Sequence, residues 1–521
     1  MQVAEVNVSL RDEVRVLMPV ESVVSGKESG VAMRPGSSTA AVGTTTDLPD
    51  FAPGIERAFP HEFPEADYTI EKIVGQVPSF LHGTYYLNGP ARFGFNGLSY
   101  QHWLDGDGMV CALRFANGQV RFRSRYVRST KFVAEQEAGR PLFRTFGTVF
   151  EGSRLNALNN GLESPVNVSV YPYGNRLLAF GEQGLPWELD PDTLDTRGQF
   201  TFSGRLNNAS PFSAHPKFDP ESGEMFNFGV FFSQTPRLYF YCFGAGGLRY
   251  RKAISLDLPY SVHDFSISRH YAVFYLSPYL LDISRLLQAG QTVMDSLQWQ
   301  PERGSRLLVL NRSNGEVAAS IPVGAGYCLH LMNSFEHEGQ LFVDVLEFDE
   351  PIYPQYQPVP SMFQTAPHGG PVRLALNLNK RQLVSRNSLP LFYSPDFPAL
   401  DPRYAMQSYD DFWMLGISAA GAHGRKFFDQ LIHANWNNAD QPADTYQCAG
   451  QRYLGGEPVF VSAPDSSAGV VICQEFDARK KQSCFLIFDA GNVSAGPMAR
   501  ILLEQVLYLG FHATFKPAVA G

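Results

Sequence analysis

The stretch HDFSISRHYAVFYLS, residues 263–277, predicts two short strands joined by a polar turn. The same pattern recurs in HPKFDPESGEMFNFGVFF at residues 215–232 and in HLMNSFEHEGQLFVDVLEF at residues 330–348. A fourth hairpin, VVICQEFDARKKQSCFLIFD at residues 470–489, has the same form without the leading histidine. The chain is therefore expected to be built mainly from hairpins.

Composition and chain length narrow the fold class. Of the 521 residues, 13% are aromatic, with 40 Phe and 23 Tyr, and there are 46 Gly and 36 Pro, which favours strands and turns. Helical patterns are few, and the best lie at residues 280–288 and 425–436. A single flat sheet with so many hairpins would accumulate unpaired edges, whereas radial repetition into a β-propeller handles them. We therefore predict an all-β fold and favour a propeller, although no sequence motif repeats at a fixed period.

Charge, hydropathy and cysteine content exclude several classes of protein. The formal net charge of −9 gives no global positive field that would attract nucleic acid. No run of about 18 uninterrupted apolar residues occurs, so we expect no transmembrane helix. The six cysteines stand apart without a CxxC pair, which predicts buried, reduced thiols in a cytoplasmic protein rather than disulfides or a thiolate zinc site.

The first 50 residues differ from the rest of the chain. Residues 25–46 are rich in Ser, Gly, Thr and Ala and contain no aromatic residue, which predicts a disordered tail over residues 1–50. The preceding segment has scattered charges and lacks the apolar core of a signal peptide. No linker-like stretch follows, so residues 51–521 are expected to form one domain.

Three histidines occupy the same position in the hairpin pattern. His215, His263 and His330 each stand where an apolar run gives way to the first strand of a hairpin. In a propeller the equivalent ends of successive inner strands surround one axis, so these side chains would converge. Neutral imidazoles that converge make a site for iron, copper, zinc or nickel. Alternatively, each of the three is an ordinary core histidine that is hydrogen-bonded to the backbone. The pattern alone does not decide between metal binding and this structural role.

Five further stretches make the hypothesis specific. They are LNGPARF (87–93), HWLDGDGMV (102–110), SAHPKFDPESGE (213–224), SVHDFSIS (261–268) and CLHLMNSFE (328–336), and GFHATF (510–515) follows near the C-terminus. In this order they resemble the motifs of the carotenoid cleavage oxygenase family. The resemblance implies a seven-bladed β-propeller with a dome of loops and helices over an axial metal site. It also implies an Fe(II) cofactor bound by His215, His263, His330 and His512, the last of which the hairpin pattern does not single out.

The resemblance also implies the surroundings of the metal. Three carboxylates that orient the imidazoles in the family match Glu182, Asp396 and Glu457. Asp396 is one methylene shorter than the family's glutamate, so its contact is expected to need a shifted backbone or a bridging water. Val168 matches a small branched residue that crowds the open side of the metal. Gly181 stands where stilbenoid-cleaving members carry a lysine that helps to ionise a phenol. The lack of this lysine argues against a stilbenoid substrate, and the small glycine is also expected to widen the cavity.

The function implied is oxidative cleavage of a carbon–carbon double bond. The expected substrates are O₂ and an apolar polyene, a carotenoid or apocarotenoid, and the products are two carbonyl compounds. The alternatives are a stilbenoid or phenylpropanoid dioxygenase with the same four-histidine iron site, a retinoid isomerase, and a propeller that only binds apolar ligands. The DGDG of residues 105–108 lacks the other ligands of a calcium loop and predicts a supporting turn.

A nearly insoluble polyene has to be drawn from a membrane or a carrier. The resemblance implies an apolar patch at the mouth of the substrate tunnel, for which residues 132–150 and 279–287 are the candidates. Both segments are equally compatible with dome helices packed on the propeller. The expected location is therefore cytoplasmic, with peripheral membrane contact and no insertion.

Overall fold

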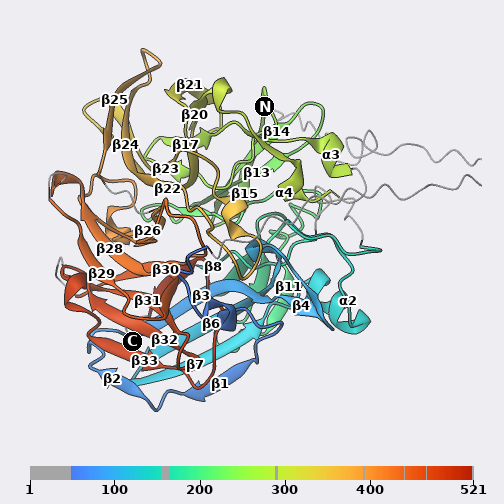
Figure 1. The fold of residues 1–521 in the computed structure, drawn as a ribbon. Coiled ribbons are helices and arrows are strands. Elements are labelled where there is room, and N and C mark those ends of the chain that lie inside the picture. The colour runs from blue at the N-terminus through green and yellow to red at the C-terminus, as the bar shows by residue number, and fades with distance from the viewer. Residues whose placement is uncertain are drawn as a thin grey trace, which may run out of the picture. The chain divides into compact units, whose positions relative to one another are not determined.

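The predicted hairpins form the blades of a β-propeller (Figure 1). The computed structural model describes residues 48–153, 163–287, 291–390, 394–438, 441–464, 466 and 468–518. Within these residues the strands make seven antiparallel sheets of four or five strands, which confirms the all-β, seven-bladed fold. The blades belong to one unit, Asp50–Gly521. Residues 1–47 of the predicted tail lie outside the described residues, so its disorder stays a prediction.

Five blades are simple meanders of four strands, and the first and last blades have five strands, some of them out of sequence order. In pairing order, the first three blades are β1 (Ala66–Thr69), β7 (Gln119–Tyr126), β6 (Asp107–Ala116), β3 (Gly83–Arg92), β34 (Ala513–Pro517); β11 (Thr196–Gln199), β10 (Trp187–Leu189), β9 (Arg176–Phe180), β8 (Ser169–Tyr173); and β12 (Lys217–Phe218), β13 (Met225–Phe231), β14 (Arg237–Gly244), β15 (Gly247–Ser255). The fourth and fifth are β16 (Ser266–Ile267), β17 (Tyr271–Leu276), β20 (Ser305–Asn311), β21 (Val317–Gly324); and β22 (Tyr327–His337), β23 (Gln340–Phe348), β24 (Gly369–Asn377), β25 (Gln382–Ser388). The sixth and seventh are β26 (Asp396–Leu400), β27 (Asp411–Gly416), β28 (Gln430–Asn435), β29 (Asp444–Gln447); and β2 (Ile73–Gly75), β33 (Ala499–Leu502), β32 (Gln482–Asp489), β31 (Gly469–Asp477), β30 (Arg452–Ser462).

Strands from both ends of the chain close the ring. β34, near the C-terminus, pairs with β3 of the first blade, and β2, near the N-terminus, pairs with β33 of the last blade. Each exchange gives a blade a strand from the opposite end of the sequence. The ring is thereby closed by backbone hydrogen bonds, with β34 as the inner strand of the first blade and β2 as the outer strand of the last.

The inner strands of neighbouring blades lie against one another around the axis. They are β34, β8, β12, β16, β22, β26 and β30. Large apolar side chains pack between the blades, as where the ring of Phe228 on β13 lies 5.4 Å from that of Phe265 and 5.2 Å from that of Phe274 on β17. Such edge-to-face pairs account for much of the aromatic content of the sequence. The propeller axis, by contrast, is lined by the side chains at the ends of the inner strands.

Shorter elements occupy the connections between strands, most of them between two strands of the same blade. They are β4 (Gly94–Phe95), β5 (Leu98–Ser99), β18 (Tyr279–Leu281), β19 (Leu297–Trp299), α2 (Thr130–Ala138), α3 (Ile283–Leu287), α4 (Val293–Ser296) and the 3₁₀ turns η2 (Ile55–Ala58), η3 (Trp103–Asp105), η4 (Pro301–Arg303), η5 (Tyr353–Tyr356), η6 (Pro402–Tyr404), η7 (Trp436–Asn438) and η8 (Val493–Ala495). Connections far apart in sequence hydrogen-bond to one another, for example Met294 N–H to the Phe146 carbonyl at 3.0 Å and Val359 N–H to the Gln101 carbonyl at 2.9 Å. Among the described residues, no helix is long and apolar enough to cross a bilayer.

The helices expected from the sequence are only partly found. The helix predicted at residues 280–288 begins later, because residues 279–281 form β18 and only Ile283–Leu287 is helical; Gln288 lies outside the described residues. The helix predicted at 425–436 is wrong. Its apolar run forms β28, which pairs with β27 on one side and β29 on the other, so sheet hydrogen bonds on both edges override the helical pattern. All four predicted hairpins are confirmed.

Two further expectations concern buried side chains. All six cysteines are buried and free of disulfides, as predicted. The DGDG segment forms a supporting turn, also as predicted. The Asp105 carboxylate accepts hydrogen bonds from the Thr148 hydroxyl at 2.5 Å and Gly147 N–H at 2.8 Å, and Asp107 pairs with the buried ammonium of Lys131 at 2.8 Å.

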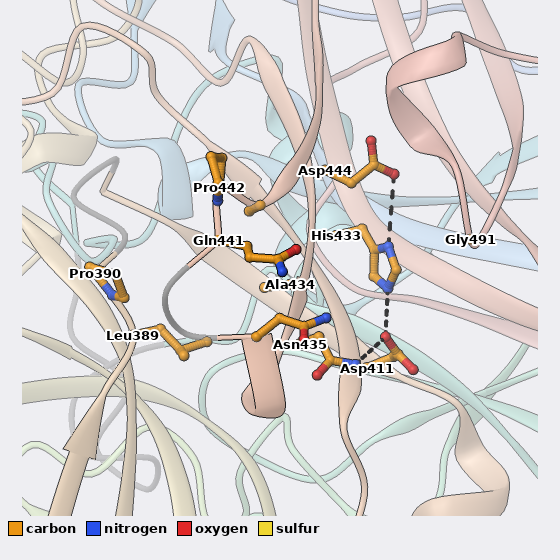
Figure 2. Close-up of a pocket in the computed structure, with 12 residues that line it drawn as sticks. Leu389, Pro390, Asp411, His433, Ala434, Asn435, Gln441, Pro442, Asp444 and Gly491 are labelled. Carbon is orange, nitrogen blue, oxygen red and sulfur yellow. Dashed lines mark hydrogen bonds and ion pairs between the residues drawn. The ribbon is translucent and has the colours of Figure 1, made fainter.

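A pocket on the sixth blade contains an imidazole held between two carboxylates (Figure 2). The His433 Nε2 lies 2.9 Å from the Asp411 carboxylate, the Nδ1 lies 3.8 Å from the Asp444 carboxylate, and the ring stacks on Trp413. Asp444 also accepts Val493 N–H at 2.7 Å, which ties this blade to the connection at η8. The cluster therefore links neighbouring segments of the fold.

This link predicts a pH-dependent contribution to stability. The hydrogen bond from His433 holds the pKa of Asp411 below its ordinary value of 3.8. A lowered carboxyl pKa stabilises the fold above the ordinary pKa and loses that effect as the pH falls through the lowered value. Because Asp411 is 51% exposed, we expect Asp411→Asn to lower the thermal midpoint by only about 1 °C at pH 7, with the difference shrinking between about pH 5 and pH 3. Circular dichroism melts across that range would check this, and an equal deficit at pH 3 would contradict it.

Candidate metal centre

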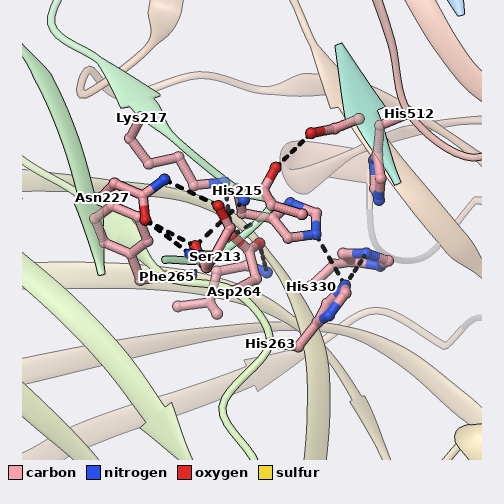
Figure 3. Close-up of polar contacts among 12 residues, drawn as sticks. Ser213, His215, Lys217, Asn227, His263, Asp264, Phe265, His330 and His512 are labelled. Atoms are coloured by element: carbon pink, nitrogen blue, oxygen red, sulfur yellow. Dashed lines mark hydrogen bonds and ion pairs between the residues drawn. The ribbon is translucent and has the colours of Figure 1, made fainter. Parts of the chain in front are cut away.

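Four imidazoles meet on the propeller axis (Figure 3). His215 and His263 lie just before β12 and β16, His330 lies near the start of β22, and His512 immediately precedes β34. Four inner strands therefore each bring one imidazole to the same end of the axis. The four residues are 3–8% exposed. The convergence predicted for the first three is found, and His512 joins them.

The Nε2 atoms of these imidazoles face one another. The Nε2 of His263 lies 2.9 Å from that of His215 and 3.3 Å from that of His330. The potential ligand atoms of all four residues lie within 4.8 Å of one another. Burial, together with the neighbouring imidazoles, holds the pKa of His215 well below its ordinary value, and burial lowers that of His512 despite the carboxylate beside it. These two rings are therefore neutral, the form that binds a metal.

Carboxylates hold the other nitrogen of three of these rings. Glu182 lies 2.9 Å from the Nδ1 of His263 and Asp396 lies 2.6 Å from that of His330. Glu457 lies 3.3 Å from the Nδ1 of His512. An ionised carboxylate only accepts hydrogen bonds, so each of these Nδ1 atoms carries a proton, and in the neutral ring the Nε2 presents a lone pair to the centre. Burial opposes protonation of His330, but the adjacent Asp396 carboxylate raises the pKa of that imidazole above its ordinary value, so a metal that binds at its Nε2 displaces a proton.

The donor set fits a divalent transition metal. Lone pairs that converge in a buried space repel one another unless a cation lies between them, and four neutral imidazoles suit iron, copper, zinc or nickel. The hydrogen bonds from Nδ1 to carboxylates are the usual supports of metal-binding imidazoles. The described residues thus bring together the four imidazoles and the three carboxylates predicted from the sequence, in an arrangement that could hold one metal ion. Their roles as ligands and supports stay predictions.

Asp396 reaches its imidazole directly, at 2.6 Å from the Nδ1 of His330, from a strand with irregular pairing. Between Asp396 and Ala399 the pairing of β26 with β27 shifts register, and the next residue, Phe397, has a φ of 54°. A left-handed conformation is costly for a phenylalanine and is tolerated where packing fixes it, here against the His330 and His512 rings at 5.7 and 5.3 Å. The contact is therefore direct, and a backbone shifted to suit the shorter side chain stays a prediction.

Val168 and Gly181 lie beside the centre. Val168 immediately precedes β8, is buried, and accepts a hydrogen bond from His512 N–H at 3.1 Å through its carbonyl. Its predicted crowding of the metal's open side stays a prediction. A Cβ at Gly181 would lie 2.1 Å from the Ser164 hydroxyl oxygen and 3.0 Å from Val166 N. The glycine therefore does not widen the cavity, because Ser164 fills the space next to it.

Asp264 is a contributor to the site that the sequence reasoning missed. Its carboxylate accepts Leu331 N–H at 2.9 Å and Phe265 N–H at 2.8 Å, and it pairs with the ammonium of Lys217 at 2.8 Å (Figure 3). These partners come from the strands that carry His215 and His330, so one side chain ties three ligand segments together. It also lies 3.8 Å from the Nδ1 of His215. Its position directly after His263 is the signal that could have found it.

One cavity borders the centre, and two smaller ones lie beside Glu182. The first, of about 350 Å³, runs along the inner strands from His215, His330 and His512 and is lined farther on by Lys217 and Asn333. Two smaller cavities on the side of the connections both border Phe146, Glu182 and Gln183. Their walls are mainly apolar and aromatic side chains. The arrangement can hold a metal ion and bring an apolar molecule next to it.

Comparison with known proteins identifies relatives over nearly the whole chain. Residues 58–517 match the family described as "Retinal pigment epithelial membrane protein". The chain is 29% identical over 475 residues to the isoeugenol monooxygenase of Pseudomonas nitroreducens, covering 87% of this chain and 95% of that protein. It is 30% identical over 481 residues to resveratrol cleavage oxygenase 1 of Aspergillus fumigatus, covering 87% and 93%.

Solved structures agree with these relatives. The apocarotenoid oxygenase of Synechocystis has a TM-score of 0.82 at 25% identity, covering 90% of this chain and 100% of that chain. A cobalt-substituted form of the Synechocystis protein is similar with a TM-score of 0.81, at 25% identity over 89% of this chain and 98% of that one. The match over most of the sequence, the seven blades and the four-histidine centre show that the chain belongs to the family of the retinal pigment epithelial membrane protein, the carotenoid cleavage oxygenases.

Proposed function

We propose that the chain is a non-haem Fe(II) dioxygenase that cleaves one carbon–carbon double bond of a carotenoid or apocarotenoid with O₂ and yields two carbonyl products. The observation that carries the proposal is the set of four Nε2 lone pairs that converge on one buried point while carboxylates hold three of the Nδ1 protons. Membership of an oxygenase family and a Synechocystis relative named apocarotenoid-15,15'-oxygenase support it.

The residues around the centre have three roles, which are to bind the metal, to orient its ligands and to exclude water. His215, His263, His330 and His512 would hold the iron, whose chemistry when bound is the activation of O₂ for alkene cleavage. The three carboxylates orient imidazoles and are engaged in hydrogen bonds, so none of them is available as a general acid or base. Addition of both oxygen atoms across the alkene needs neither an acid nor an external reductant. The aromatic walls, such as Phe146, keep water out and hold the double bond next to the centre.

A hydroxylated stilbene or phenylpropanoid is the second candidate substrate. The observation in its favour is that two relatives at 29% and 30% identity are named isoeugenol monooxygenase and resveratrol cleavage oxygenase. Against it, Gly181 supplies no side chain to ionise a phenol, and Ser164 closes the space that such a side chain would use. A carotenoid or apocarotenoid therefore remains the favoured substrate.

We infer a cytoplasmic location with peripheral contact to a membrane that supplies the substrate. Val133 on α2 and Leu287 at the end of α3 lie in the two segments expected at the tunnel mouth and are 40% and 57% exposed. Exposed apolar side chains on short helices suit contact with a bilayer surface.

The function is tested by substrate turnover with a defined isotope balance. We expect anaerobically purified, Fe(II)-loaded protein to bleach a carotenoid or apocarotenal in the presence of ¹⁸O₂ and to release two carbonyl fragments that each carry the label. Product mass spectrometry checks both the labels and the bond that is cleaved. Cleavage of hydroxystilbenes alone would transfer the proposal to the second substrate class. Metal binding without turnover of any alkene, or isomerised products without O₂ consumption, would contradict a dioxygenase.

A further inference from the structure

The 3₁₀ turn η5 places two phenols on two of the carboxylates behind the metal centre. The hydroxyl of Tyr353 donates to Glu182 at 3.0 Å and lies 3.0 Å from the Nδ1 of His263. The hydroxyl of Tyr356 lies 3.4 Å from the Asp396 carboxylate. Residues three apart lie on the same face of a 3₁₀ turn, so one short element reaches both carboxylates at once. Both tyrosines are only 2–3% exposed.

A fifth histidine, which is not a ligand, fixes this turn. The Nδ1 of His102 accepts Leu104 N–H at 3.1 Å, so the proton of this ring sits on Nε2, which donates to the Tyr353 carbonyl at 3.0 Å. The His102 ring also packs on Tyr356 at 5.8 Å. Burial lowers the pKa of His102, which keeps the ring in this neutral form. The turn is therefore held at its backbone and at one ring before its hydroxyls meet the carboxylates.

The third supporting carboxylate has a different second partner. Glu457 accepts Ala513 N–H at 3.2 Å, a backbone group on β34. Asp396 likewise accepts a backbone N–H of the propeller, from Phe397 on β26 at 2.8 Å, in addition to the hydroxyl of Tyr356. The carboxylate of Glu182 is therefore the one that depends most on η5, that of Asp396 depends on it in part, and that of Glu457 is held by the propeller.

We propose that Tyr353 and Tyr356 are positioning residues that set the orientation of the His263 and His330 imidazoles through Glu182 and Asp396, and thereby the affinity of the centre for its metal. The inference rests on the proposed metal site but not on the identity of the substrate. Because the Tyr353 contact is 3.0 Å and the Tyr356 contact 3.4 Å, Tyr353 carries the larger share. The connection that covers the centre is in this way coupled to the ligands below it.

The test compares the loss of single hydroxyls. We expect Tyr353→Phe to weaken Co(II) binding about 10-fold, the lower end of the range for loss of an outer partner, and Tyr356→Phe to weaken it by about 3-fold. The visible absorption of bound Co(II) should shift in Tyr353→Phe, which a purely packing role would not cause. Tyr279→Phe is the matched control, because this phenol is also buried, its ring lies 6.5 Å from that of Tyr353, and its hydroxyl has no hydrogen-bond partner among the described residues.

The outcomes separate this inference from the proposed function. Wild-type affinity and spectrum in Tyr353→Phe, with the same thermal midpoint in the metal-free state, would overturn the positioning role and leave the dioxygenase proposal intact. Weakened Co(II) binding in Tyr353→Phe but not in Tyr279→Phe would support the role even if no alkene is cleaved. Equal losses in both variants would show a general packing effect and overturn it. Absence of Co(II) binding by the wild-type chain would overturn both proposals.

Discussion

His263→Ala is expected to lose the bound metal and, with it, all measurable alkene cleavage. The Nε2 of His263 is the one that lies close to both His215 and His330, at 2.9 and 3.3 Å, so its removal opens the centre of the donor set. The same change leaves Glu182 without its imidazole partner. The loss in metal affinity should therefore exceed the roughly 100-fold that removal of an outer partner alone can cause.

Metal content and product formation measured on the same samples check this expectation. After loading with Fe(II) and removal of excess metal, the wild-type chain should retain about one iron per chain and His263→Ala almost none. His433→Ala is the matched control, since this imidazole is also hydrogen-bonded to a carboxylate but lies in the pocket of the sixth blade and outside the four-histidine cluster (Figure 2). A full equivalent of tightly held iron in His263→Ala would show that the four-histidine centre is not the metal site.

The parts of the fold that could be predicted from the sequence are those that depend on local pattern. The hairpins at residues 263–277 and 330–348 can be recognised from the apolar runs on either side of a polar turn, and they occur as predicted. Residues 425–436 show the limit of this reasoning. Their periodicity suits a helix, but partners on both sides, β27 and β29, are supplied by distant residues and make the segment a strand.

The metal centre, too, could be predicted from the sequence only in part. Three ligands share a position in the hairpin pattern, so the sequence suggests their convergence. His512 has no such pattern, because its strand joins the first blade from the other end of the chain, and only the family resemblance pointed to it. Tyr353 and Tyr356 had no signal at all. Their role depends on a 3₁₀ turn in the connection between β23 and β24 of the fifth blade and on distances to carboxylates that no local spacing encodes.

Replacing Asp396 gives the second large effect, and its graded series tests the geometry more closely. Asp396 lies 2.6 Å from the Nδ1 of His330, and both residues are only 2–3% exposed. Asp396→Ala leaves this Nδ1 without a partner in a buried space, which frees the ring to change its tautomer and turn. We expect metal affinity and kcat/KM to fall by about 10–100-fold and the metal-free protein to lose about 3–5 kcal/mol of stability, the usual cost of breaking a buried pair.

Of the two conservative replacements, we expect asparagine to be well tolerated and glutamate, although it is the residue of the family, to weaken metal binding. Asp396→Asn keeps an oxygen that accepts the Nδ1 proton and loses only the charge, so it should retain most of the metal affinity. Asp396→Glu restores the residue that the family resemblance predicts, yet it should bind metal worse than the wild type. The shorter side chain already lies 2.6 Å from the Nδ1 of His330, so an extra methylene would push the carboxylate into His330. Co(II) titrations and thermal melts in chelator check the order Asp, Asn, Glu, Ala. A glutamate variant that binds as tightly as the wild type would show that the backbone of β26 relaxes freely and does not define the site.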